Sequence, residues 1–417
     1  MKPWLGEIRD DLEQLRAAAL LRRLEEVQAA GPMLRRGARD LVNLASNDYL
    51  GLASHPHLRA AAVAAIEAHG TGAGSSRLVV GHLAPHARAE QRFAAFKHAQ
   101  AALLCPTGFM ANLAVLTALA GPGDLVCLDK LCHASLIDAA RASGALVRVF
   151  PHLGYAKLER LLQDRAKTPR LDKSASPGLS PRNPGVSRAP RKLIVTDSIF
   201  SMDGDAADLP ALCDLADRYD AILIVDEAHG TGVLGPSGAG LGELQGVSKR
   251  IDVTVSTASK ALGGLGGIVT ARREVIDALV NHARCFIYTT AVPPAQAAVL
   301  EAALDILRDE PWRRQRLAEL SARLTAQLAP LGLLPAPRGQ PSPPVVTPII
   351  PLVVGTPQRA LALAEHLARH GLYAPAIRPP TVAPGSCRVR VSLRADLDDA
   401  VLDRLVDALS RWRPDRD

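Results

Sequence analysis

The sequence predicts an α/β protein whose core is a mostly parallel β-sheet. From about residue 58 onward, short apolar runs alternate with helical stretches, and this alternation is typical of βαβ units. Hydrophobic residues make up 48% of the 417-residue chain and charged residues 22%, which is the balance of a globular protein. Because the chain is longer than one hydrophobic core usually serves, we expect more than one domain. The expected units are an N-terminal helix and extended segment (1–50), a large domain (51–291) and a smaller α+β C-terminal domain (292–417).

The first predicted element is an amphipathic helix at residues 5–30. Leu, Ala and Val recur there at helical spacing with Arg and Glu between them, and Gly31 and Pro32 stop the pattern. Six apolar runs farther along the chain predict the strands of the sheet. They span residues 101–105, 124–129, 145–150, 192–197, 221–226 and 252–257.

The remaining stretches predict a loop and the smaller domain. Residues 168–191 are rich in Pro, Ser and Arg without apolar periodicity, so we expect a long surface loop. A helical pattern runs from 296 to about 330, and a Pro-rich link at 335–345 follows it. The rest of the chain alternates strand and helix in shorter pieces, which we assign to the smaller domain.

Composition and charge argue against several classes of function. The net charge is +7, but Lys and Arg are scattered and aromatic residues make up only 3%, so we expect no nucleic-acid partner. None of the six cysteines forms a CxxC pair, and we expect no metal site. The first residues lack the apolar core of a signal peptide, and no later run is long and apolar enough to span a bilayer. We therefore expect a cytoplasmic protein without a membrane partner.

The strand at 221–226 ends in a carboxylate, Asp226, and His229 follows three residues later. Ligands of open α/β sheets bind at the carboxyl ends of the strands, so both side chains are well placed to face a site. In the alternative interpretation, Asp226 caps a turn or helix and His229 lies on the surface.

The strand at 252–257 runs into Thr257, Ser259 and Lys260. A lysine with its usual pKa of about 10.4 is a poor nucleophile at neutral pH. Small neighbours let a bulky aldehyde reach the amine and desolvate it, which favours a Schiff-base lysine. The alternative is an ordinary lysine that extends its amine from a strand end into water.

A lysine on one strand end and a carboxylate on another are what pyridoxal 5'-phosphate requires. The lysine holds the aldehyde, and the carboxylate keeps the pyridine nitrogen protonated so that the ring accepts electrons. A helix start at Gly108 and Phe109 offers N–H groups for the phosphate, and Thr257 adds a hydroxyl. His133, just after the strand at 124–129, is placed to stack on the ring, although a lone histidine there is more often structural.

Eight motifs that contain or flank these residues follow one another along nearly the whole chain. They are "NDYLGL" (47–52), "TGFMAN" (107–112), "CHASLID" (132–138), "FSMDGD" (200–205), "VDEAHGTGVLG" (225–235), "TASK" (257–260), "YTTAVPP" (288–294) and "IRPPTVAPG" (377–385). Together they resemble the α-oxoamine synthase family of pyridoxal phosphate-dependent enzymes. The resemblance implies fold type I, the architecture of aspartate aminotransferase.

The resemblance also implies roles in cofactor binding and catalysis. Lys260 would hold the aldehyde, Asp226 would pair with the pyridinium nitrogen, and His133 would stack on the ring. His229 and Ser201 would bind near the phenolic oxygen. The phosphate would be held by Gly108, Phe109 and Thr257, with Thr289 or Thr290 from the neighbouring subunit of a homodimer.

Four further residues are implied to bind substrate. Arg378 would grip the carboxylate of the amino acid, for which its planar fork of donors is suited. Arg22 would meet the distal carboxylate of the acyl chain, while Asn47 and Thr381 would lie in the same region.

Within the family, the C-terminal "AIRPPTV" looks most like the member that acts in biotin biosynthesis. That likeness implies L-alanine and pimeloyl-CoA, or pimeloyl-acyl carrier protein, as substrates of a decarboxylative condensation. Other members, such as 2-amino-3-ketobutyrate CoA ligase or 5-aminolevulinate synthase, are the first alternative. A non-catalytic dimeric scaffold that keeps the fold is an alternative from another class.

Overall fold

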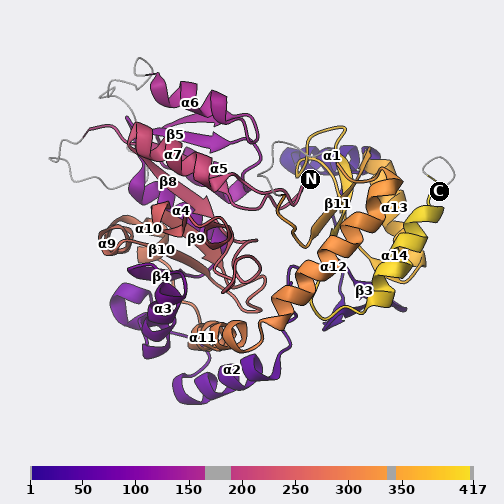
Figure 1. Ribbon diagram of the computed structural model, residues 1–417, viewed down its shortest axis with the longest axis horizontal. Coiled ribbons are helices and arrows are strands. Elements are labelled where there is room, and N and C mark those ends of the chain that lie inside the picture. The colour runs from indigo at the N-terminus through magenta and orange to yellow at the C-terminus, as the bar shows by residue number, and fades with distance from the viewer. Residues whose placement is uncertain (1, 165–188, 336–343, 414–417) are drawn as a thin grey trace.

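The computed structural model describes residues 2–164, 189–335 and 344–413. The predicted surface loop at 168–191 therefore lies almost wholly outside the described residues. Figure 1 shows a large body built on one wide sheet and a smaller body beside it, with helix α12 (Trp312–Leu328) running between them.

The large body is built on a seven-stranded sheet in the order β4-β10-β9-β8-β7-β5-β6. Strands β5 to β9 pair in parallel, and only β10 is antiparallel to its two neighbours. The predicted mostly parallel sheet is confirmed, and all six predicted strands lie within one residue of their expected bounds. The seventh, β10, was missed because its apolar run directly follows a series of glycines. The strands are β4 (Ala101–Cys105), β5 (Leu125–Asp129), β6 (Leu146–Phe150), β7 (Lys192–Asp197), β8 (Ala221–Asp226), β9 (Val253–Thr257) and β10 (Gly267–Ala271).

The central strands are mainly apolar until they reach their carboxyl ends, because helices cover both faces of the sheet. In β7, Leu193 and Val195 join one hydrophobic cluster, while Ile194 between them joins the other. One face packs against α4 (Gly108–Leu119), α5 (Ala134–Ala142), α9 (Arg273–His282) and α10 (Arg284–Ile287). The other packs against α2 (Pro56–His69), α3 (Ala84–Phe96), α6 (Tyr155–Gln163), α7 (Leu209–Tyr219) and α11 (Pro294–Asp309).

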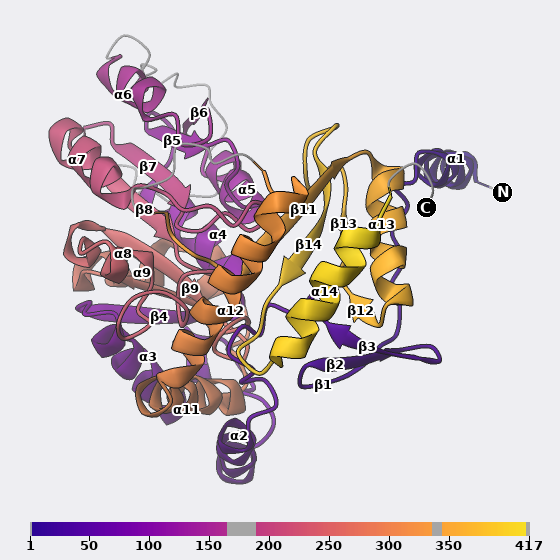
Figure 2. The same cartoon turned by 45° about the vertical axis from the view of Figure 1, so that its right-hand side comes forward.

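The smaller body combines both ends of the chain, as Figure 2 shows. An antiparallel sheet has the order β11-β14-β13, and a second sheet has the order β1-β2-β3-β12. In the second sheet, β12 pairs in parallel with β3, so the N-terminal strands are completed by a strand from the last fifth of the chain. The elements are β1 (Gln28–Ala30), β2 (Met33–Arg36), β3 (Arg39–Asn43), β11 (Ile349–Gly355), α13 (Pro357–Arg369), β12 (Leu372–Tyr373), β13 (Ala376–Ile377), β14 (Cys387–Ser392) and α14 (Asp399–Arg411).

Two predicted helices differ from the structure. The helix expected at 5–30 is α1 (Pro3–Ala17), and residues 28–30 form a strand instead. The helix ends where Ala19 takes a left-handed φ of 56°, and pairing with β2 then decides the conformation of the strand residues. The single helical run expected from 296 to about 330 is two helices, α11 and α12, because Pro311 between them cannot continue the hydrogen-bond ladder.

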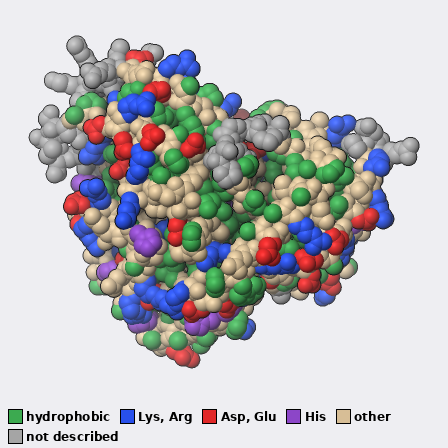
Figure 3. All heavy atoms as spheres, in the orientation of Figure 1, with side chains coloured by type: hydrophobic (Ala, Val, Ile, Leu, Met, Phe, Trp, Pro, Cys, Tyr) green, Lys and Arg blue, Asp and Glu red, His purple; other side chains and the backbone are tan. Residues whose placement is uncertain are grey.

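Surface charges are mixed in sign. In Figure 3, basic and acidic side chains are interspersed over the visible face and form no single-sign stripe there. In the part of the chain that the structure describes, no helix combines the length and the apolar character needed to cross a membrane.

Candidate active site

A cavity of about 250 Å³ opens where β7, β8 and β9 reach their carboxyl ends. This is the position at which open α/β sheets bind their ligands. Eight of the predicted site residues line it, and they come from strand ends, from the start of α4 and from two loops. The eight are Gly108, Phe109, His133, Ser201, Asp226, His229, Thr257 and Lys260.

Asp226 ends β8, and both oxygens of its buried carboxylate are held in place. Oδ1 accepts the backbone N–H of Ala228 at 2.8 Å, and Oδ2 accepts Nδ2 of Asn112 at 2.7 Å. Asn112 lies on α4, only 1% exposed. The carboxylate therefore has a fixed orientation in the cavity wall.

A second carboxylate, Asp197, lies directly beside Asp226 at the end of β7, because the two residues are partners in the register of β7 and β8. Burial and the neighbouring Asp226 raise the pKa of Asp197 well above its usual range, although the N–H of His133, donated to Oδ2 at 2.8 Å, partly offsets them. Asp197 is therefore protonated more readily than an exposed aspartate.

His133 caps the start of α5, and its hydrogen bonds fix its tautomer. Nδ1 accepts the backbone N–H of Ser135 at 3.3 Å and lies 2.7 Å from the Ser135 hydroxyl. That hydroxyl accepts Nδ2 of Asn112 at 2.9 Å, so its own proton is free to go to Nδ1. The neutral ring thus carries its proton on Nε2, and a polar chain runs from His133 through Ser135 and Asn112 to Asp226. Burial lowers the pKa of His133, and Lys260 lowers it further against the opposing effect of Asp226.

Lys260 follows β9 and faces the two carboxylates. Burial lowers its pKa below the ordinary lysine value, while Asp226 and Asp197 act in the opposite direction. The hydroxyls of Thr257 and Ser259 lie 2.7 Å apart nearby. The amine is therefore deprotonated more readily than a surface lysine.

His229 lines the cavity and is buried among polar groups from distant parts of the chain. Its Nδ1 lies 2.7 Å from the hydroxyl of Tyr49, and Arg390 donates to that hydroxyl at 3.1 Å and to Oδ1 of Asn47 at 2.9 Å. Burial, Lys260 and Arg390 together lower the pKa of His229 well below its usual value. His229 is thus a neutral imidazole whose orientation Tyr49 helps to hold.

The predicted substrate residues lie outside this cavity lining, but three of them meet one another. Nη2 of Arg22 donates to the carbonyl oxygen of Pro379 at 3.2 Å and to Oγ1 of Thr381 at 3.3 Å. Arg378 donates to the carbonyl oxygen of Ala19, and burial and the nearby Arg22 lower its pKa. We call the group of Arg22, Arg378 and Thr381 the arginine rim.

Comparison with known proteins shows the family to which the chain belongs. The family model described as "Aminotransferase class I and II" matches residues 39–409. The chain belongs to this family. This aminotransferase-family chain is also 46% identical over 413 residues to the 8-amino-7-oxononanoate synthase of Anaeromyxobacter dehalogenans, a match that covers 99% of this chain and 96% of that protein.

Solved structures agree with the assignment of the chain to the class I and II aminotransferase family. A serine palmitoyltransferase variant from S. paucimobilis, with a bound pyridoxal phosphate–myriocin aldimine, has a TM-score of 0.84 and 26% identity, and 97% of this chain and 96% of that chain are covered. The 8-amino-7-oxononanoate synthase of Francisella tularensis has a TM-score of 0.72 and 25% identity, with coverage of 89% and 97%. The predicted family resemblance, the fold type I architecture and pyridoxal phosphate as cofactor are confirmed.

The cavity of this aminotransferase-family chain fits pyridoxal phosphate. The first N–H groups of α4, which lack intrahelical acceptors, start at Gly108 beside the Thr257 and Ser259 hydroxyls and offer donors for a phosphate. Oδ1 of Asn112 is buried without a hydrogen-bond partner, which marks a polar position that a ligand completes. An amine and a carboxylate that suit the aldehyde and the pyridine nitrogen line the same space.

Thr289 and Thr290 do not line the cavity of their own chain. Thr290 forms an isolated bridge with Ser76, and both threonines lie at the surface beside α10. Their predicted contact with the phosphate of a neighbouring subunit stays a prediction.

Four site residues escaped the sequence analysis. Asp197 ends a predicted strand, so the argument that selected Asp226 also applied to it. Tyr49 and Asn112 lie inside two of the recognised motifs but were not singled out. Arg390 gave no signal, because nothing in a strand of the smaller body indicates a hydrogen bond to a residue 341 positions away.

Proposed function

We propose that this protein is a pyridoxal phosphate-dependent acyltransferase, an 8-amino-7-oxononanoate synthase of biotin biosynthesis. It condenses L-alanine with a pimeloyl thioester and releases 8-amino-7-oxononanoate, carbon dioxide and the free thiol. The observation that carries the proposal is the meeting of Lys260, Asp226 and the start of α4 around one cavity. The 46% identity to a synthase of that name supports this activity over other members of the family.

When bound, pyridoxal phosphate supplies an aldehyde that captures amines and a ring that accepts electrons. Lys260 is the residue that would hold the aldehyde, and its Nζ would take the α-proton of alanine as general base. The lowered pKa of Lys260 suits this task, because a larger share of the amine is neutral near pH 7. The carbon that loses the proton would attack the thioester carbonyl, and the thiolate would leave and take up a proton. The carboxyl group would then depart as carbon dioxide, and a proton would replace it on the same carbon.

The other cavity residues would orient the cofactor and polarise its ring. Asp226 would keep the pyridine nitrogen protonated, and its bonds to Asn112 and Ala228 fix the orientation of the carboxylate. His133 would stack on the ring as a neutral imidazole, and His229 and Ser201 would bind near the phenolic oxygen.

The arginine rim recognises carboxylates. Arg378 binds the carboxylate of alanine, and Arg22 binds the distal carboxylate of the pimeloyl chain, with Thr381 beside them. Asn47, which Arg390 contacts, would bind substrate from the side of Tyr49 and His229. The nearby Arg22 lowers the pKa of the half-buried Arg378, and two cationic guanidinium groups placed together favour anionic ligands.

We also propose a homodimer. Leu78, Val79 and Val80 are 52%, 73% and 69% exposed. They lie beside the segment that carries Tyr288, itself 72% exposed, because Ser76 bridges Thr290. A second copy of the chain would bury this apolar patch. The two threonines beside the patch would then reach the phosphate site of that second copy.

The cytoplasm is the compartment that we propose for the enzyme. All six cysteines are free, and five of them are buried. Buried thiols without disulfide partners suit a reducing compartment.

Borohydride reduction followed by peptide mapping tests the cofactor attachment, and the label is expected on Lys260. Assays that pair alanine or glycine with pimeloyl-CoA, pimeloyl-acyl carrier protein, acetyl-CoA and succinyl-CoA test the reaction. We expect turnover with alanine and a pimeloyl donor. Turnover only with glycine and a shorter donor would assign the protein to another branch of the family, and a label elsewhere would refute the site.

A further inference from the structure

The loop of residues 200–205, here called the Ser201 loop, contributes only Ser201 to the cavity, yet its other residues are held from two sides. The loop is closed on itself, because the N–H of Phe200 donates to the carbonyl of Asp205 at 3.0 Å and the N–H of Gly204 donates to the carbonyl of Phe200 at 2.8 Å. An isolated bridge between Ile199 and Ala206 closes its base. Its position therefore depends on what holds this closed turn against the sheet.

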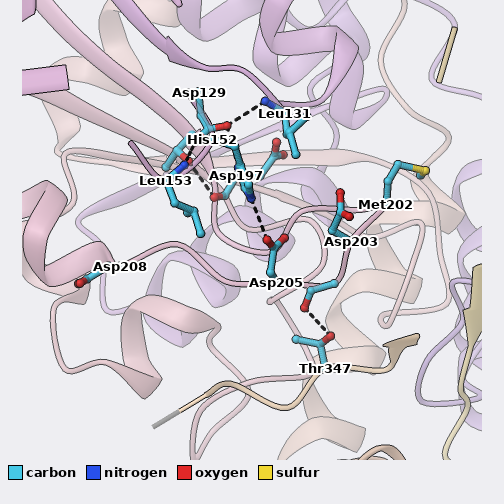
Figure 4. Close-up of polar contacts among 12 residues, drawn as sticks. Asp129, Leu131, His152, Leu153, Asp197, Met202, Asp203, Asp205, Asp208 and Thr347 are labelled. Atoms are coloured by element: carbon cyan, nitrogen blue, oxygen red, sulfur yellow. Dashed lines mark hydrogen bonds and ion pairs between the residues drawn. The ribbon is translucent and has the colours of Figure 1, made fainter. Parts of the chain in front are cut away.

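His152 holds the loop from the large body, as Figure 4 shows. Its Nε2 lies 2.8 Å from Oδ2 of Asp205, and its Nδ1 lies 3.0 Å from Oδ1 of Asp129 at the end of β5. The ring also meets Phe200 edge-on at 4.3 Å between centroids. The side chains of His152 and both carboxylates are all less than 10% exposed.

Asp129, which His152 contacts, also binds the turn that leads to His133. Its Oδ1 accepts the N–H of Leu131 at 2.8 Å, and its Oδ2 accepts the N–H of Leu153 at 2.9 Å. One imidazole thus joins the turn before His133 to the Ser201 loop, and both ends of this connection reach the cavity wall.

The smaller body holds the other side of the Ser201 loop. Nη1 of Arg388 donates to Oδ1 of Asp203 at 2.6 Å and to the carbonyl of Met202 at 3.0 Å. Oγ1 of Thr347 donates to the carbonyl of Gly204 at 2.7 Å. Gly204 has a φ of +73°, and a Cβ there would lie 2.4 Å from the carbonyl oxygen of Ile349, so only glycine permits this contact.

The charges around His152 favour its protonated form. Burial alone would lower the pKa of the ring, but hydrogen bonds and charge from Asp129 and Asp205 outweigh it and raise the pKa to about 9. The ionisable group that approaches from α6 is Tyr155, whose hydroxyl accepts the N–H of Asp208. At neutral pH the ring therefore donates to both carboxylates at once.

We propose that His152 is a positioning residue of the active site, which fixes Ser201 and His133 relative to each other by bridging Asp205 and Asp129. The proposal rests on the proposed function, because it assumes that Ser201 and His133 contact the cofactor. It assigns the last acidic residue of the "FSMDGD" motif a role in holding the loop.

His152→Gln tests the proposal, because glutamine is uncharged and carries both N–H donors on one nitrogen, whereas the imidazolium donates from two separate nitrogens of its ring. We expect about tenfold weaker binding of pyridoxal phosphate, measured by absorbance titration, which is the usual scale for losing an orienting contact. At saturating cofactor, kcat should fall while KM for alanine stays unchanged. Hydrogen exchange of the cofactor-free full chain should be faster in residues 198–207 and 130–136.

His366→Gln is the matched control. His366 is a buried histidine on α13 of the smaller body, and its Nε2 lies 2.9 Å from the carbonyl oxygen of Ala408 on α14. This variant should leave cofactor binding and exchange in both segments unchanged.

Asp205→Asn is a second variant that tests the bridge even if His152→Gln does not fold. It weakens only one arm of the bridge, so exchange should rise in residues 198–207 but not in 130–136. Unchanged exchange and cofactor affinity in Asp205→Asn, or in a folded His152→Gln, would overturn the inference. A wild-type protein that binds no pyridoxal phosphate would instead refute the proposed function, while the exchange result would still report on the bridge.

Discussion

The strand-end residues that line the cavity, here called the floor, are held in place differently from the arginine rim. Floor residues such as Asp226 and Thr257 end adjacent strands and are 5% and 3% exposed. Rim residues lie on loops, and Arg22 is exposed and is held by bonds to backbone oxygens. The residues to which we assign the chemistry are thus fixed by the sheet, whereas those to which we assign substrate selection are placed by contacts between two ends of the chain.

The largest expected effect comes from the floor. Lys260→Ala should abolish turnover and leave a folded protein, because no other side chain supplies both the aldehyde link and the base. Lys130→Ala is the control, since it removes an exposed amine one residue after β5. Measurable condensation by Lys260→Ala, with the thiol release followed over hours, would contradict the assignment.

Substitutions of the two floor carboxylates, Asp226 and Asp197, should lower kcat to different extents. Asp226→Asn should lower kcat by about hundredfold or more, since it removes a charge directed at the ring nitrogen. Asp197→Asn should cost less than tenfold, because the raised pKa of Asp197 already favours a neutral carboxyl that asparagine imitates. Steady-state kinetics on both variants checks the order, and equal losses would show that the register pair shares one role.

The contribution of the His152 bridge to the free energy of unfolding should depend on pH. The pKa of His152 is raised to about 9 in the folded chain from about 6.5 when unfolded, so its contribution is complete below pH 6.5 and is lost as the pH rises through 9. This change amounts to roughly 3 kcal/mol in the free energy of unfolding. Denaturant unfolding at several pH values measures it, and His152→Gln should lack this part of the pH dependence.

The smallest effect is expected at the rim. Arg22→Ala should raise KM for the pimeloyl donor about tenfold and leave kcat and cofactor absorbance unchanged, since one charged hydrogen bond is lost. Arg23→Ala, a neighbouring exposed arginine, should leave KM unchanged. A fall in kcat for Arg22→Ala would mean that floor and rim are not independent.

The sequence predicted the floor better than the rim. Strand ends are visible as apolar runs that stop at a polar residue, so the pattern of residues alone places Asp226 and Lys260 on one edge of a sheet. The partners that orient them could not be found in this way, because Asn112, Tyr49 and Arg390 reach the site through packing between distant segments. Helix ends were predicted least well, since tertiary pairing at residues 28–30 outweighed a helical pattern.

The bond between Arg22 and the carbonyl of Arg378 spans 356 positions of sequence. This rim contact therefore joins a residue near the start of the chain to one in its last tenth. A product that began at the internal Met33 would lack Arg22 but keep every residue that lines the cavity, so binding of the cofactor alone would not show that the donor site is intact.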